Sequence, residues 1–168
     1  LGLTSYRVAE YRPPEFLVDV SADSGARFAQ DSMGAAVEAR YLFGAPMGRA
    51  AVRWSLRQES LLYEGVEIPG TEGFSIGDVG WWYEELSEPR APVGIPASGI
   101  DTLDANGRLG LRLRLGDTER GRPSRATLEA TVTDVNRQTV SAAASFIVHP
   151  AAFYLAARPE GESWFWSA

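Results

Sequence analysis

The stretch VEARYLFGAPMGRAAVRWSLR, residues 37–57, decides the fold class. In its first half, apolar side chains recur at every second position, at Val37, Ala39, Tyr41 and Phe43. After the glycine- and proline-containing segment 44–48 the alternation resumes, at Ala50, Val52, Trp54 and Leu56. A period of two is typical of a half-buried β-strand. The stretch therefore predicts two antiparallel strands joined by a turn as a hairpin.

The same alternation recurs on both sides of this stretch. It covers residues 16–20 before it and residues 109–115, 127–133 and 139–148 after it, with turn-forming sequences such as Asn106-Gly107 between the strands. No segment of comparable length has a helical period. Six or seven strands of this kind predict an all-β fold, an antiparallel β-sandwich. The residues expected in its interior are Val37, Tyr41, Val52, Trp54, Leu111, Leu113, Leu128, Ala130 and Val132.

Composition excludes several classes of function. The chain has 168 residues, enough for one domain with a real core, and no cysteine, which excludes disulfide frameworks, cysteine nucleophiles and thiolate metal sites. All 16 basic residues are arginine, and the 22 acidic residues leave a net charge of −6. This acidic balance argues against nucleic acid as a partner, because phosphate neutralisation requires a basic excess. No apolar run approaches the length of a membrane-spanning helix.

The span 59–100 is expected to be a long insertion in the sandwich. It is rich in glycine and proline, lacks periodicity and exceeds the length of an ordinary connection. It also contains the aromatic residues Phe74, Trp81, Trp82 and Tyr83, which either pack onto the sandwich or form a platform for a ligand. We expect residues 1–14 to link a preceding domain, residues 15–149 to form the sandwich, and residues 150–168 to start the next domain.

Candidate chemistry along the chain is sparse. The single histidine, His149, has no catalytic partner in the sequence and is read as a linker residue. Glu84-Glu85 resembles a glycosidase acid pair, but adjacent carboxylates point apart in an extended chain. The acidic segment 101–107 lacks the ligand spacing of a calcium loop and is explained by a turn. No catalytic residue, cofactor or metal is therefore expected, and alternating arginines are read as a solvated sheet face paired with acids, at Arg53, Arg57, Arg112 and Arg114.

Spaced motifs over most of the chain resemble the bacterial alpha-2-macroglobulin family. The stretch VAEYRPPEF, residues 8–16, resembles the start of an early macroglobulin-like domain in that family. ARYLFGAP, residues 39–46, is similar to a second motif, with Met47 where valine is commoner. LDANG at 103–107, LEATVTD at 128–134 and the junction at His149-Pro150-Ala151 resemble the later strands and the passage to the next domain.

The resemblance implies a macroglobulin-like sandwich, related to immunoglobulin and fibronectin-III folds, with no enzyme activity of its own. Such a domain is structural, within a multidomain broad-spectrum endopeptidase inhibitor that traps proteases after a bait region is cleaved. The chain has no cysteine, so the family's Cys-Gln thioester cannot lie within it. The alternative is an independent ligand-binding or adhesion module. Residues expected at an interface are Trp81, Trp82, Tyr83, Trp164 and Trp166.

The resemblance also implies partners and a location. The partners would be neighbouring macroglobulin-like domains of the same chain and, through the full-length protein, target proteases. Nucleic acid and direct membrane contact by this region are not expected. The location would be the periplasm or cell envelope, with a role in bacterial defence, and a lipoprotein anchor on the parent is an open alternative.

Overall fold

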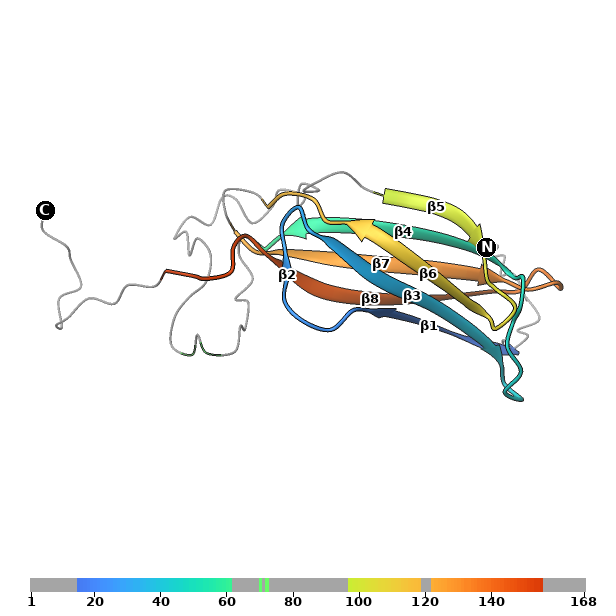
Figure 1. Ribbon diagram of the computed structural model, residues 1–168. Coiled ribbons are helices and arrows are strands. Elements are labelled where there is room, and N and C mark those ends of the chain that lie inside the picture. The colour runs from blue at the N-terminus through green and yellow to red at the C-terminus, as the bar shows by residue number, and fades with distance from the viewer. Residues whose placement is uncertain (1–14, 62–69, 71, 73–96, 119–121, 156–168) are drawn as a thin grey trace, which may run out of the picture.

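A computed structural model describes residues 15–61, 70, 72, 97–118 and 122–155. Within these residues, eight strands form two facing sheets (Figure 1). The three-stranded sheet has the order β1-β3-β6, and the five-stranded sheet has the order β2-β8-β7-β4-β5. The strands are β1 (Phe16–Ala22), β2 (Arg27–Phe28), β3 (Ser32–Tyr41), β4 (Ala51–Ser60), β5 (Ala97–Thr102), β6 (Arg108–Arg114), β7 (Ser124–Thr133) and β8 (Thr139–His149).

All strand pairs are antiparallel except β2 with β8, which is parallel. The described residues form strands and turns and contain no helix. The predicted all-β sandwich is therefore confirmed.

The core lies between the two sheets and follows the predicted alternation. The side chains that are fully buried there include Phe16, Val37, Val52, Leu128, Ala130, Val132 and Val148. Of the residues expected in the interior, Tyr41, Trp54 and Leu111 are only half-buried. Each lies at a margin of the core: Tyr41 ends β3, Leu111 is on the edge strand β6, and Trp54 lies beside the edge strand β5.

The predicted hairpin over residues 37–57 is wrong. β3 pairs with β1 and β6, whereas β4 pairs with β5 and β7, so the two strands belong to different sheets. The connection crosses from one sheet to the other, held by hydrogen bonds from Tyr41 N to Ala45 O (2.8 Å) and from Met47 N to Ala39 O (3.0 Å). Alternation identifies the buried face of a strand, not the neighbour along its edge. The turn at Asp134 to Gln138, by contrast, does join paired strands, β7 and β8.

Two strands, β2 and β5, were not predicted from the sequence. β5 includes residues 97–100, which the sequence assigned to the insertion, and the predicted strand β4 continues to Ser60. β5 pairs directly with β4, so the residues between them join neighbouring strands of one sheet. Most of the predicted insertion, together with Phe74 and residues 1–14 and 156–168, lies outside the described residues, and the proposed domain boundaries stay predictions.

Trp54 fastens the short edge strand β5 to the sheet. Its indole lies against Gly99, where an added Cβ would be 2.7 Å from the ring, so only glycine leaves room for it. Its Nε1 donates a hydrogen bond of 2.9 Å to the Asp101 carboxylate. The Trp54 side chain therefore holds β5 both by packing and by a hydrogen bond. These contacts add to the backbone pairing with β4, which is the only strand that β5 pairs with among the described residues.

We expect Trp54→Phe to reduce the free energy of unfolding by about 2 kcal/mol, because it removes the hydrogen bond to Asp101 and also the indole atoms that lie against Gly99. Urea unfolding followed by circular dichroism measures this. Asp101→Ala should cost about 1 kcal/mol, and the double variant little more than Trp54→Phe alone, because both single variants remove the same bond. Fully additive costs would show that the bond contributes nothing.

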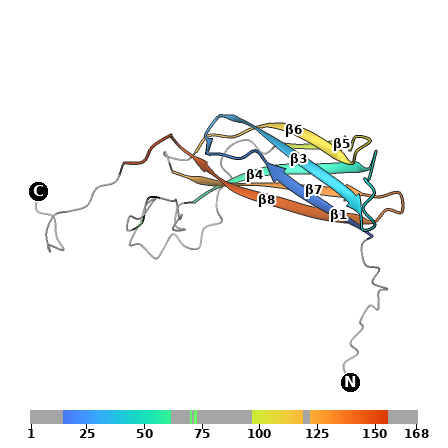
Figure 2. The same cartoon turned by 60° about the horizontal axis from the view of Figure 1, so that its bottom comes forward.

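The chain enters and leaves the sandwich at opposite ends. β1 begins at the end where β3 leads into β4 and β7 turns into β8, as the pairs Phe16 with Tyr41 and Ala51 with Thr133 require. We call this end the N-terminal pole. β8 runs to the other end, the C-terminal pole (Figure 2), and β2 pairs with it there.

Candidate functional site

The interface residues predicted from the sequence lie outside the described residues. These are Trp81, Trp82, Tyr83, Trp164 and Trp166. Their role stays a prediction, and the candidate site is built from the part of the chain that the structure describes.

The acidic segment 101–107 forms a backbone turn. The Asp104 carboxylate accepts hydrogen bonds from the backbone of Asn106 (2.8 Å) and Arg108 (2.9 Å), while Asp101 binds Trp54. Among the described residues, no group of three or more His, Cys, Asp or Glu side chains is arranged to hold a metal ion. Within the same part of the chain, no helix has the length and apolarity that crossing a bilayer requires.

At the C-terminal pole, His149 holds the segment that follows β8. Its Nδ1 lies 2.7 Å from the hydroxyl of Tyr154, and its ring packs against Phe28 and Tyr154 with centroids 6.1 and 5.9 Å away. Burial lowers the pKa of His149 and raises the pKa of Tyr154, so both groups are neutral at pH 7. The predicted linker histidine is therefore a structural contact that directs the chain as it leaves, with Phe153 and Leu155 exposed beside it.

At the N-terminal pole, the β3–β4 connection presents an exposed apolar loop. Leu42 is 63% exposed and Phe43 is 80% exposed. The sequence alternation placed Phe43 on the buried face with Tyr41, and this prediction is wrong. β3 ends at Tyr41, and the chain turns at Gly44, whose φ is +94°. Phe43 then stacks on the Tyr41 ring, with centroids 5.2 Å apart and planes 6° from parallel.

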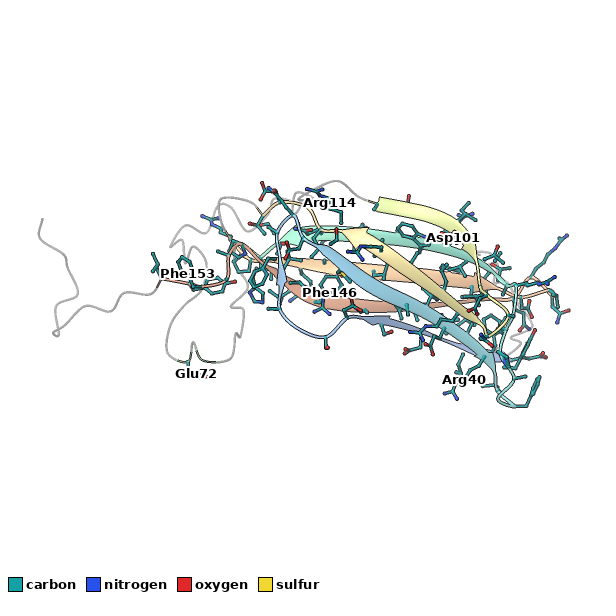
Figure 3. All side chains as sticks on the ribbon, viewed as in Figure 1. Arg40, Glu72, Asp101, Arg114, Phe146 and Phe153 are labelled. Carbon is teal, nitrogen blue, oxygen red and sulfur yellow. The ribbon has the colours of Figure 1, made fainter. Side chains whose placement is uncertain are left out.

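A hollow of about 560 Å³ adjoins this loop. Its walls come from the outer side of β1 and β3 and from the turns that follow β3 and β5, and they include Leu17, Asp19, Glu38, Arg40, Gly44 and Gly107. Figure 3 shows Arg40 at this end of the sandwich. Glu38 already forms an ion pair with Arg108, at 3.4 Å. The loop and the hollow together make the N-terminal pole the best candidate for an interaction surface.

The alternating arginines are exposed, as predicted. Arg53 and Arg57 project from β4, and Arg112 and Arg114 project from β6, on the outer faces of two different sheets. They therefore do not form a single basic stripe.

Comparisons with known proteins define the class. No protein-family profile matches the chain. An alpha-2-macroglobulin homolog of Nostoc sp. is 30% identical over 105 residues, which is 62% of this chain and 5% of that protein. The trypsin-activated alpha-2-macroglobulin of Escherichia coli has the same fold over 84% of this chain and 9% of its own, with a TM-score of 0.63 and 20% identity. The Salmonella alpha-2-macroglobulin that has reacted with methylamine gives a TM-score of 0.63 at 20% identity, over 85% of this chain and 9% of its own.

The fold is thus that of a β-sandwich domain found in alpha-2-macroglobulins. The resemblance to the bacterial alpha-2-macroglobulin family that the motifs indicated is confirmed by sequence similarity and by fold. The chain spans about one-twentieth of the curated relative's length.

Proposed function

We propose that this chain is a structural domain of a bacterial alpha-2-macroglobulin that traps proteases after cleavage of a bait region. The sequence similarity to the Nostoc homolog supports the proposal most directly. The path of the chain from one pole to the other also supports it, because such a domain can lie in series between two others. Its contribution is shape and contact surface rather than catalysis.

The proposal extends to partners, boundaries and location. Neighbouring macroglobulin-like domains flank residues 15–149, and target proteases are met only through the complete inhibitor. The complete protein acts in the periplasm or cell envelope as part of bacterial defence. The aromatic residues of the insertion and of the last segment contribute to contacts between domains.

The test compares the full-length polypeptide with the isolated chain. We expect full-length protein to suppress tryptic digestion of a large protein substrate, because a trapped protease is shielded from macromolecules. The isolated 168-residue chain should leave trypsin activity on both a large protein and a small chromogenic substrate unchanged. A stoichiometric loss of trypsin activity with the isolated chain would contradict a purely structural role, and an inactive full-length protein would contradict the trap.

A further inference from the structure

We propose that the N-terminal pole is the docking surface for the domain that precedes this one in the same polypeptide, with Phe43 as its anchor. The inference rests on the proposed function, since it requires a multidomain chain. It adds the surface, the anchoring residue and the kind of partner.

Large exposed apolar side chains gather at the ends of the sandwich. Among the described residues, Phe43 and Val135, which is 89% exposed, lie in connections at the N-terminal pole, and Phe153 and Leu155 lie beyond the C-terminal pole. Ile100, 74% exposed, lies instead on the outer face of the five-stranded sheet, opposite Arg53 of β4. Exposed apolar groups that cluster where the chain enters and leaves are suited to contacts with domains before and after it.

The loop that presents Phe43 is already ordered. Gly44 N donates to Tyr41 O at 2.8 Å, Tyr41 N donates to Ala45 O at 2.8 Å, and Arg40 forms a β-bridge with Pro46. Stacking on Tyr41 fixes the Phe43 ring with one face outward. The Phe43 side chain and its loop therefore lose little conformational entropy when a partner covers the ring, which is the property of an anchor residue.

The hollow beside the loop indicates a protein partner. Asp19 and Arg40 bring opposite charges to its walls, and the Glu38 carboxylate is shared with Arg108. An apolar anchor bordered by polar groups of both signs matches the centre and rim of a protein interface. A lipid surface or a nucleic acid would favour a uniformly basic border.

The position at which the chain enters the sandwich indicates that the partner is the preceding domain. The backbone N–H of Leu42 donates to the carbonyl of Glu15 at 3.0 Å, so the polypeptide reaches β1 beside the exposed loop. With residues 1–14 as the proposed linker, a preceding domain lies at most about 50 Å along the chain from Phe43. A tether of this length gives an effective concentration in the millimolar range, so one anchor and a short rim suffice for docking.

Hydroxyl-radical footprinting with mass spectrometry tests the proposal. In the full-length polypeptide, we expect oxidation of Phe43 to fall about fivefold relative to the isolated chain, as for a residue excluded from solvent at an interface centre. Equal oxidation of Phe43 in the two proteins would overturn the proposal.

A pair of variants identifies the anchor. Phe43→Ser in the full-length polypeptide should return oxidation of Leu42 to the level of the isolated chain. Ile100→Ser, the matched change of an equally exposed apolar residue on β5, should leave Leu42 protected. When either substitution is made in the isolated chain, the unfolding temperature should equal that of the unmodified isolated chain. Leu42 protection that survives Phe43→Ser would show that Phe43 is not the anchor.

Three further outcomes separate the alternatives. Concentration-dependent protection of Phe43 in the isolated chain, with dimers in sedimentation, would show that a second copy occupies the pole and would overturn the proposal. A full-length protein that inhibits proteases with Phe43 still exposed would defeat this inference alone. Protection of Phe43 in a full-length protein that traps no protease would defeat the proposed function alone.

Discussion

Gly107→Ala is expected to lower the free energy of unfolding by about 3 kcal/mol, the sum of left-handed backbone strain and steric overlap. Gly107 has a φ of +74°, and a Cβ there would lie 2.5 Å from Ala39 O and 2.9 Å from Met47 N. Its own carbonyl accepts a 2.9 Å hydrogen bond from Ala39 N, so the backbone cannot retreat without breaking β3 from the turn. Urea unfolding of the isolated chain measures the loss.

Gly44→Ala is the matched control for that substitution. Gly44 also has a left-handed backbone, with φ at +94°, but an added Cβ would meet nothing within 4 Å. We expect a cost of about 1 kcal/mol from the backbone alone. Equal losses at Gly44 and Gly107 would mean that the close approach between the two turns has no energetic weight.

The second large effect is expected at Gln58. Its buried amide joins β4 to the β6–β7 connection: Nε2 donates to Asp117 O and Ser124 Oγ, both at 2.9 Å, and Oε1 accepts from Gly116 N at 3.0 Å. Gln58→Leu breaks all three hydrogen bonds while keeping most of the volume. Because the bond to Ser124 is buried and the other two are part-buried, we expect a loss of about 3 kcal/mol in unfolding free energy, measured by urea unfolding.

Gln30→Leu provides the comparison. Gln30 donates to the other side of the same connection, Nε2 to the Asp117 carboxylate at 3.2 Å, but this bond is exposed and water can replace it. Its loss should cost about 0.5 kcal/mol. If the two glutamine variants were equally stable, burial of the Gln58 amide would not be the source of its effect.

The sequence predicted the composition of the core better than the connections between strands. Val52, Leu128 and Val132 are buried because alternation determines which face of a strand avoids water, and that is a local property. The hairpin at residues 37–57 failed because sheet membership depends on edge partners far away in sequence, such as the pairing of β4 with β7. β5 was missed because Ser98 and Gly99 break the alternation, and Trp54 supplies the packing that the strand itself lacks.

The candidate site was harder to predict, for a related reason. Extending the alternation of β3 by two residues placed Phe43 on the same face as Tyr41, although Gly44 and Pro46 already signalled a turn. The apolar residues that attracted attention, such as Trp81 and Trp82, lie outside the described residues. The exposed loop at the N-terminal pole could have been found only by ending the strand at Tyr41.

The opposite positions of the two poles have a mechanical consequence. A force applied through the chain before β1 and after β8 acts on strands of different sheets, because β1 pairs with β3 while β8 pairs with β7 and β2. Tension is therefore transmitted from sheet to sheet through side chains of the core, such as Phe16 and Val148, rather than along a ladder of backbone hydrogen bonds. Pulling would shear the two sheets past one another, and the packing contacts between their side chains would set the force at which the domain unfolds.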